Sequence, residues 1–295
     1  MRASWRCRTT AVRRARSSEA LPRDPASGSV ALCLQVRFFS HTLPAAKDGY
    51  DVQIQVNHLS HFLMTSILMP SLEKASKARG EARIVTHSSA ARFLGLQKLP
   101  FGATFEKCEA NTLGGNSGAV KLMNFVGPQI MRYCHSKLAN SVFVMALHEK
   151  LAAKGSKVKA IAAEPGIADT KLMVNGFNTK TEVSVAGSLK SGALKMFSCI
   201  SVMQSAADGA LPLMAACFAS DAASGDMYCP SKKAVLPTGA GPKIIYNKGP
   251  PFKTIVAGVP IYGPSDKKER DTVKPENLAI LWEKSEAATG VKFTV

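Results

Sequence analysis

A tyrosine and a lysine four residues apart are the residues of this chain best suited to acid–base chemistry. Tyr133 and Lys137 are the first and last residues of the segment Tyr-Cys-His-Ser-Lys. On a helix their side chains project from one face, about one turn apart. A neighbouring ammonium favours the tyrosinate form of a phenol, which makes the hydroxyl usable as an acid or a base near neutral pH. With a Ser or Asn donor to polarise a carbonyl oxygen, the pair would serve a hydride-transfer site.

The same spacing occurs a second time, at Tyr228 and Lys232. Pro230 lies between these two residues and Pro237 follows them, so the long helix that would hold the side chains together cannot form. We therefore predict that Tyr228 is a structural or surface tyrosine.

The elements around Tyr133 indicate a parallel sheet. Tyr133 begins the clearest helical pattern in the chain, which we expect to extend to Ala153. Residues 82–89 and 158–163 are short apolar segments typical of buried strands. A helix between two strands lets parallel strands become neighbours, so we predict an α/β fold. Ser88-Ser89 and Pro165-Gly166 then follow neighbouring strands at the carboxyl edge, where ligands bind in such sheets.

The remaining patterns predict three further helices and two less regular regions. The helices are expected at residues 52–72, 206–218 and 276–289, the last framed by Pro275 and Gly290. Residues 95–130 are expected to be a long excursion, and the stretch after residue 218 to be rich in turns. The glycine-rich residues 114–118 do not follow a strand, so we interpret them as loop rather than as a phosphate-binding motif.

Composition excludes several classes of protein. The 295 residues are 46% hydrophobic, which is enough for a substantial core. Seven widely spaced cysteines without a CxxC pair indicate neither a disulfide framework nor a zinc site. The histidines do not lie at the spacing from one another and from a carboxylate that metal ligands have. We therefore expect the histidines to be hydrogen-bonded and predict no metal site. The net charge of +17 is split unevenly along the chain, and the lysines after residue 40 are scattered among acidic residues, which argues against a nucleic-acid partner. No apolar run is long enough for a transmembrane segment.

The first 45 residues differ from the rest of the chain. Residues 1–40 contain eight Arg, no Lys and two acidic residues. This composition is typical of an organelle transit peptide, which would place the protein in a mitochondrion or plastid. A disordered tail or a misassigned start of the coding region explains the composition equally well, and the protein would then be cytoplasmic. We predict a tail over residues 1–45 and one catalytic domain over residues 46–295.

From about residue 46 to its end, the chain resembles the short-chain dehydrogenase/reductase family, and its retinol-dehydrogenase-like branch in particular. Residues 55–62 resemble the VNHLGHF helix of that branch, with Ser60 in place of glycine. Residues 82–89 resemble its RIVNVSS strand, and residues 133–140 are identical to its YCHSKLAN string. Residues 164–170 resemble its HPGxxxT loop, with Glu164 in place of histidine.

The resemblance implies a catalytic tetrad. Tyr133 would be the general acid and base, and Lys137 would bind the nicotinamide ribose and lower the pKa of Tyr133. Ser89 would hydrogen-bond the substrate oxygen, with Ser88 as its rival for that role. Asn57 would hold the water of a proton relay.

The resemblance also implies a cofactor, NADP or NAD, with NADP slightly preferred. Besides Tyr133 and Lys137, the cofactor-binding residues would lie in the loop after the second strand and would contact the nicotinamide end through backbone groups and a threonine hydroxyl: Pro165, Gly166, Ile167 and Thr170. Apolar residues in the segments that would cover the substrate favour a lipophilic alcohol or carbonyl.

The family's TGxxxGxG, selector and NNAG motifs are absent, and the first fifty residues hold only Gly28 and Gly49. Glycines in such a loop let the backbone approach the pyrophosphate of a dinucleotide. We therefore expect a partial Rossmann-like doubly wound parallel sheet, in which residues 30–36 fill one strand position. The exposed sheet edge predicts a homo-oligomer or aggregation.

Two functions remain open at this point. One is an NAD(P)-dependent oxidoreductase whose missing half is supplied by a longer chain or a partner. The other is a truncated, inactive relative, either a binding protein or an incomplete gene model.

Overall fold

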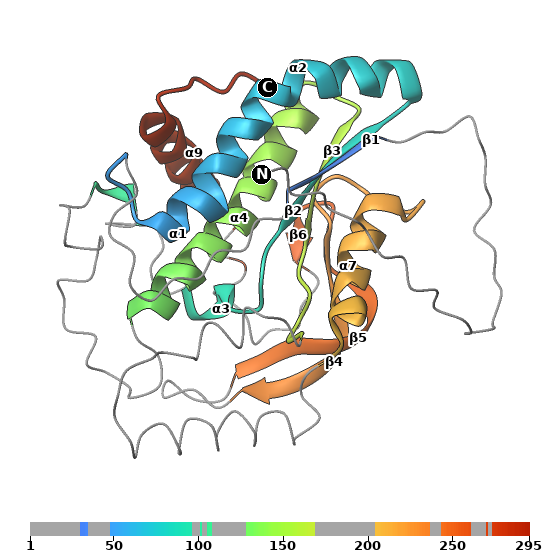
Figure 1. Cartoon of the computed structure of the whole chain (residues 1–295). Coiled ribbons are helices and arrows are strands. Elements are labelled where there is room, and N and C mark those ends of the chain that lie inside the picture. The colour runs from blue at the N-terminus through green and yellow to red at the C-terminus, as the bar shows by residue number, and fades with distance from the viewer. Residues whose placement is uncertain are drawn as a thin grey trace, which may run out of the picture.

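We analysed a computed structural model of the chain (Figure 1). The structure describes residues 30–34, 48–95, 101, 105–107, 128–168, 204–236, 243–260, 270 and 273–295.

The described residues form one six-stranded sheet with the strands in chain order. Its strands are β1 (Val30–Leu34), β2 (Ala82–His87), β3 (Val158–Ala163), β4 (Met227–Leu236), β5 (Lys243–Val256) and β6 (Val259–Pro260). The first four strands are parallel, and Ala82 faces Val30 on one side and Val158 on the other. Every residue of β2 is buried, as expected of a parallel strand covered on both faces. The predicted α/β sheet and its two central strands are confirmed, and β1 fills the strand position foreseen for residues 30–36.

The other edge of the sheet differs from the prediction. β4 pairs with β5 in antiparallel orientation, and β5 pairs with β6 in the same way. The sheet is therefore mixed, and a long hairpin replaces the turn-rich stretch expected after residue 218. Pro230 and Pro251 face each other in this hairpin next to an irregularity in the register, where prolines are tolerated in strands. These prolines concealed the strands from the sequence pattern.

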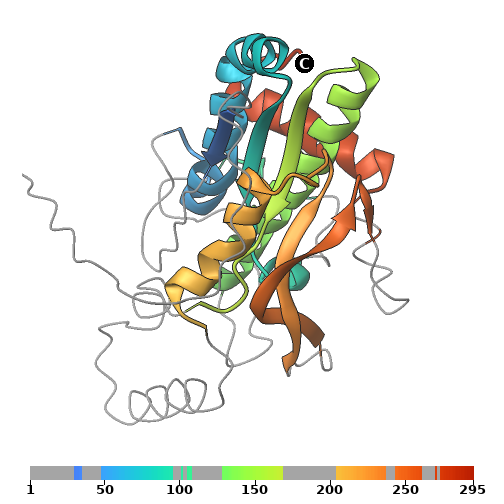
Figure 2. The same cartoon turned by 90° about the vertical axis from the view of Figure 1, so that its right-hand side faces the viewer.

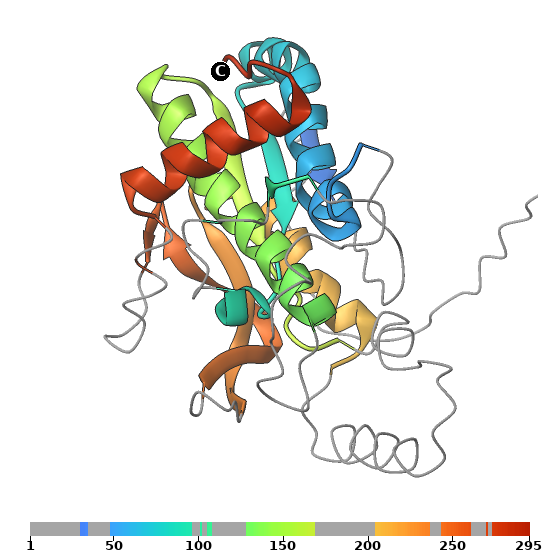
Figure 3. The same cartoon turned by 90° about the vertical axis from the view of Figure 1, so that its left-hand side faces the viewer.

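Helices cover both faces of the sheet. One face carries α1 (Val52–Ile54), η1 (Gln55–Leu59), α2 (Ser60–Arg79), α4 (Pro128–Ala153) and α9 (Pro275–Thr289). The other face carries α7 (Ala206–Phe218), and the short α3 (Arg92–Gly95) follows β2. Figures 2 and 3, which view the molecule from opposite sides, show α7 and α9 respectively in front of the sheet. The doubly wound arrangement is confirmed.

The limits of α7 and α9 follow the sequence signals closely, whereas α2 continues to Arg79, beyond the predicted helix end at residue 72. α7 spans the predicted residues, and its N-cap Ser205 accepts a hydrogen bond from the backbone N–H of Asp208. α9 begins at Pro275 and ends at Gly290, which adopts the left-handed conformation typical of a helix end. α4 begins at Pro128, five residues before Tyr133. Among the described residues, no helix is both long and apolar enough to cross a membrane.

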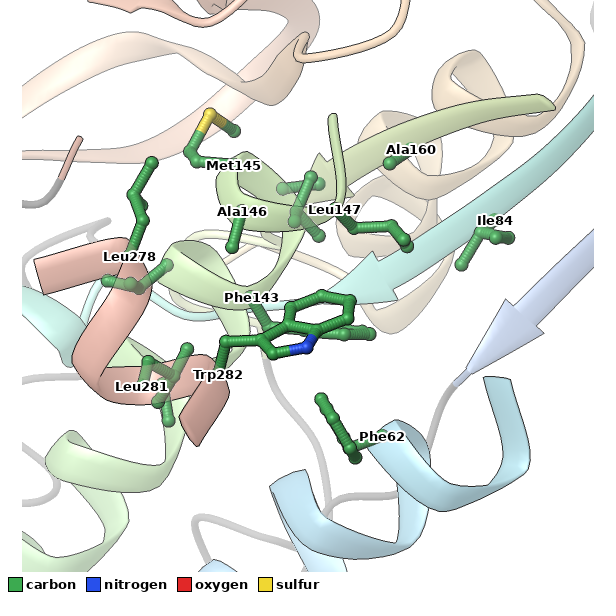
Figure 4. Packing of buried hydrophobic residues seen from close by; sticks show 14 of the residues in the cluster. Phe62, Ile84, Phe143, Met145, Ala146, Leu147, Ala160, Leu278, Leu281 and Trp282 are labelled. Carbon is green, nitrogen blue, oxygen red and sulfur yellow. The ribbon is translucent and has the colours of Figure 1, made fainter. Parts of the chain in front are cut away.

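An aromatic cluster holds α2, α4 and α9 together (Figure 4). The ring of Trp282 on α9 lies 5.2 Å from the ring of Phe62 on α2 and 6.1 Å from that of Phe143 on α4. Phe293 lies 4.9 Å from Trp282 and completes the cluster. Because aromatic side chains bury large apolar areas, these contacts fix α4, the helix that carries Tyr133 and Lys137, against its neighbours.

Candidate active site

Tyr133 and Lys137 lie one turn apart on α4 and face the interior of the protein. Tyr133 is 9% exposed and Lys137 is completely buried. The Lys137 ammonium lies 5.8 Å from the centre of the Tyr133 ring. The helical spacing on which the acid–base prediction depends is therefore present.

The buried ammonium is held by the end of β2. Lys137 Nζ donates a hydrogen bond of 3.2 Å to the carbonyl oxygen of His87, the last residue of that strand. Asn140 Nδ2 donates to the same oxygen at 3.1 Å. A buried charge is costly without hydrogen-bonding partners, so this carbonyl helps to fix Lys137 at the carboxyl edge of the sheet.

The two serines after β2 have different surroundings. Ser88 is fully buried, and its hydroxyl contacts Lys137 O at 3.0 Å and Ser141 Oγ at 2.7 Å. Ser89 is partly exposed, and its hydroxyl oxygen accepts a hydrogen bond of 3.2 Å from the backbone N–H of Ala91. Since accepting that bond leaves its proton available, Ser89 fits the role of donor to a substrate oxygen better than Ser88 does.

Asn57 lies in the π-helical turn η1, between α1 and α2. Its Nδ2 donates a hydrogen bond of 2.9 Å to Ser136 Oγ, which in turn donates to the carbonyl oxygen of Tyr133 at 2.8 Å. Single π-helical turns occur often at functional sites. The side chain of Asn57 thus connects its own helix to the turn of α4 that carries Tyr133 and Lys137.

A buried ion pair joins the start of α1 to α4. Asp51 Oδ2 lies 2.6 Å from Nε of Arg132, the residue directly before Tyr133. Asp51 Oδ1 also accepts hydrogen bonds from the backbone N–H groups of Gln53 and Ile54, as an N-cap does. Burial raises the pKa of Asp51, and the charge of Arg132 partly opposes that rise. The sequence analysis missed this pair because its members lie on different helices.

A second ion pair lies beside Ser89. Arg92 and Glu164 are both completely buried, and Arg92 Nη1 contacts Glu164 Oε2. The same Nη1 donates to the carbonyl oxygen of Ser89 at 3.2 Å. The charge of Glu164, which stands in place of the histidine of similar loops, is therefore balanced by Arg92.

His58 and His61 are buried next to the lysine-bearing helix. His58 contacts Ser285 Oγ at 2.8 Å and Asn140 Oδ1 at 3.3 Å, so it is a hydrogen-bonding histidine as predicted. Burial lowers its pKa to about 3. His61 does not fit the prediction, because neither of its ring nitrogens has a hydrogen-bond partner. Burial and then the charge of Lys137 lower the pKa of His61 to about 4.

The loop after β3 was expected to contact a nicotinamide through its backbone, but three of its backbone groups already have protein partners. The N–H of Ile167 donates to Asn247 O at 3.0 Å, and the carbonyl of Ile167 accepts from Gln204 N at 2.9 Å. Gln204 Nε2 donates to the carbonyl of Pro165 at 2.5 Å. Thr170 lies outside the described residues.

Tyr228 lies on β4, so it does not share a helix with Lys232. Its ring is buried and the ammonium of Lys253 lies 5.6 Å from the ring centre. Burial raises the pKa of Tyr228. Its exclusion from the catalytic pair is therefore supported by the strand context.

Comparison with known proteins identifies similar dehydrogenases. Retinol dehydrogenase 12 of Bos taurus is 35% identical over 130 residues, which are 44% of this chain and 33% of that protein. Human retinol dehydrogenase 11 is 35% identical over 126 residues, or 43% of this chain and 32% of that protein. Mouse polyprenol dehydrogenase is 32% identical over 127 residues, again 43% and 32%. This chain resembles short-chain dehydrogenases of the retinol-dehydrogenase type. It spans about a third of the length of these relatives.

Solved structures are less similar. An uncharacterized protein of Mycobacterium paratuberculosis is 22% identical with a TM-score of 0.48, over 92% of this chain and 71% of that one. A short-chain dehydrogenase/reductase of Caenorhabditis elegans with cofactor is 13% identical with a TM-score of 0.32, over 66% of this chain and 53% of that one. Both TM-scores are below 0.5, so neither structure defines the fold of this chain. No model of a protein family matches the sequence.

The structure thus brings together part of the site that the retinol-dehydrogenase resemblance implies. The structure brings Lys137, Ser88 and the end of β2 together, and hydrogen bonds join Asn57 to the Tyr133 turn. The catalytic role of each residue stays a prediction. Among the described residues, no group of three or more His, Cys, Asp or Glu side chains could hold a metal ion. A cavity of about 380 Å³ near Glu73, Lys154 and Ser156 lies at the opposite edge of the sheet, before β3 begins.

Proposed function

We propose that this chain is an oxidoreductase of the short-chain dehydrogenase/reductase type, which transfers a hydride between NAD(P)(H) and a lipophilic alcohol or carbonyl. The observation that carries the proposal is the buried Tyr133–Lys137 pair, one turn apart on α4 at the carboxyl edge of the parallel strands. Similarity to retinol and polyprenol dehydrogenases supports an apolar substrate, although it covers only part of each relative.

The residues of this chain would manage the proton and the substrate oxygen. In the reducing direction, Tyr133 would donate its phenolic proton to the oxygen of the carbonyl as that oxygen becomes an alcohol. The ammonium of Lys137 would stabilise the tyrosinate left behind, and the hydroxyl of Ser89 would polarise the carbonyl. Asn57 would support the turn that aims Tyr133, because its amide reaches that turn through Ser136. The cofactor would supply or accept the hydride.

The described residues do not fit the nicotinamide end of the cofactor in their present arrangement. The N–H of Ile167 is used by Asn247 O, and Gln204 binds the carbonyls on both sides of Gly166.

Turnover of a lipophilic substrate tests the proposal. Purified chain would be assayed with NADPH or NADH and retinal, and in the reverse direction with NADP⁺ or NAD⁺ and retinol or a polyprenol. We expect Tyr133→Phe to lower kcat by at least about 10²-fold, because it removes the general acid and keeps the ring. Tyr228→Phe is the matched control, since it removes a buried tyrosine hydroxyl from β4, and it should leave kcat within about twofold.

A cofactor-free binding protein is the second candidate, and the occupied backbone groups of Pro165 and Ile167 favour it. Calorimetric titration of the purified chain with NADPH and NADH separates the two candidates. Absence of both binding and turnover in this polypeptide would exclude the oxidoreductase and leave the binding protein.

A further inference from the structure

The hairpin of β4 and β5 lies against the loop that follows β3. Asn247 on β5 is 3% exposed, and its carbonyl oxygen accepts the hydrogen bond from the N–H of Ile167 at 3.0 Å. The preceding residue, Gly166, adopts a positive φ of 65°. The loop is thus joined to a hairpin that belongs to a different part of the sequence.

The approach of the two backbones at Gly166 leaves no room for another group. A Cβ atom added there would lie 2.7 Å from the carbonyl carbon of Asn247 and 2.8 Å from Cγ of Pro230. Both distances are below any normal non-bonded contact between carbon atoms. Neither a side chain nor the edge of an aromatic ring can therefore enter between Gly166 and the hairpin.

Gln204 connects the loop to the hairpin from the side. Its Nε2 donates to the carbonyl of Pro165 at 2.5 Å, and its Oε1 accepts from the N–H of Gly249 at 3.1 Å. Gln204 is 8% exposed, so both bonds form in a site with little water to replace them. One side chain thus bonds both partners of the contact.

The acceptor that occupies the N–H of Ile167 is the same kind of group as the carboxamide oxygen of the expected cofactor. The carbonyl of Asn247 is an amide oxygen, and the carboxamide of nicotinamide carries an amide oxygen too. A backbone N–H makes one near-linear hydrogen bond, so it cannot serve both acceptors at once.

We propose that the β4–β5 hairpin, held by Gln204, is an autoinhibitory element that must leave the Pro165–Ile167 loop before the nicotinamide end of NAD(P)(H) can bind. The proposal rests on the proposed function, because that function assigns the loop to the nicotinamide. The apparent affinity of the chain for a nicotinamide is then its intrinsic affinity multiplied by the fraction of molecules with the hairpin released.

Titration with half-cofactors tests the hairpin separately from catalysis. Nicotinamide mononucleotide and adenosine monophosphate would each be titrated calorimetrically into the full chain and into Gln204→Ala. We expect Gln204→Ala to bind nicotinamide mononucleotide about tenfold more tightly, because losing two bonds raises the released fraction. Its affinity for adenosine monophosphate should not change. Val256→Ala, a truncation at the far end of β5, is the control and should match the unmodified chain with both ligands.

Hydrogen exchange at the Ile167 amide provides the second measurement. In the unmodified chain this amide should be protected, and in Gln204→Ala it should exchange faster, while amides of β2 and β3 exchange as before. Unchanged β2 and β3 exchange shows that the variant is folded. Free exchange of the Ile167 amide in the unmodified chain would overturn the proposal.

The remaining outcomes distinguish this inference from the proposed function. If both proteins bind nicotinamide mononucleotide equally, the hairpin does not inhibit, and the oxidoreductase proposal stands. If Ile167 exchanges faster in Gln204→Ala but neither protein binds nicotinamide mononucleotide or NADPH, the loop is not a nicotinamide site and both proposals fail.

Discussion

Around Tyr133 and Lys137, buried polar groups hydrogen-bond to one another between the helices and strands of the core. Around Pro165 and Ile167, the backbone groups of the loop bond instead to the β4–β5 hairpin and to Gln204. In the first region, β2 and α4 are joined through the His87 carbonyl and the Ser88 hydroxyl. In the second, Asn247 and Gln204 satisfy the loop. The arrangement of Tyr133 and Lys137 therefore depends on core packing, whereas the Pro165–Ile167 loop is held by Asn247 on β5 and by Gln204.

The strongest test of this comparison is the Arg92–Glu164 pair, which lies between the two regions. Arg92→Met should lower the free energy of unfolding by about 3–5 kcal/mol, because it leaves the fully buried Glu164 carboxylate without its partner charge. Urea denaturation measures the loss. The double variant Arg92→Met, Glu164→Gln should recover much of it, since no buried charge remains. Equal losses in the single and double variants would show that the charge itself is not the cause.

The pH dependence of stability tests the region around Tyr133 and Lys137. The folded-state pKa values of His58 and His61 are lowered to about 3 and about 4, chiefly by burial. Both histidines are therefore neutral in the fold, whereas an unfolded histidine takes up a proton below about pH 6.5. Their contribution to stability is complete above that pH. It should fall by about 1.4 kcal/mol per pH unit for each histidine as the pH drops toward the folded values.

Urea denaturation at about pH 7, 6 and 5 measures this slope. His61→Phe should reduce the slope by about 1.4 kcal/mol per pH unit, because one neutral buried imidazole is removed. A slope that is the same in the variant and the unmodified chain would show that His61 is not held neutral by the fold.

A pair of glycine substitutions sharpens the comparison on the hairpin side. Gly290→Ala at φ 69° meets no atom within 4 Å, so it should cost only the strain of the left-handed conformation, about 1 kcal/mol. Gly166→Ala, at φ 65°, also meets the hairpin and should cost more by about 1–3 kcal/mol. Thermal unfolding measures both. Equal costs would mean that the hairpin moves away from Gly166 freely.

Ser88 and Ser89 give the smallest effect on stability and the clearest separation of roles. Ser88→Ala should lower the free energy of unfolding by about 1–3 kcal/mol, because buried partners at Lys137 and Ser141 lose a hydrogen bond. Ser89→Ala should change stability by less than about 0.5 kcal/mol, but lower kcat by about 10²–10³-fold. Turnover and urea denaturation of both variants check this. The reverse pattern would give the catalytic role to Ser88.

Local signals predicted several elements well. The Pro275 and Gly290 frame marks α9, and the residues of α7 were predicted within its observed limits. Pro230 correctly excluded a helix at Tyr228, but it also concealed β4, because prolines are rare in strands. The π-helical turn around Asn57 has no local signature that the sequence analysis could use.

Tyr133 and Lys137 can be predicted from the sequence as an acid–base pair, because their spacing and the helix that carries them are local properties of the chain. Only the tertiary structure decided their surroundings. Arg92 meets Glu164, and Ile167 meets Asn247, across long stretches of sequence. Such pairs form when sheet and helices bring distant segments together, and no periodicity or composition records which segments meet. The acid–base pair can be recognised in the sequence, whereas the hairpin on the expected cofactor loop becomes visible only in the fold.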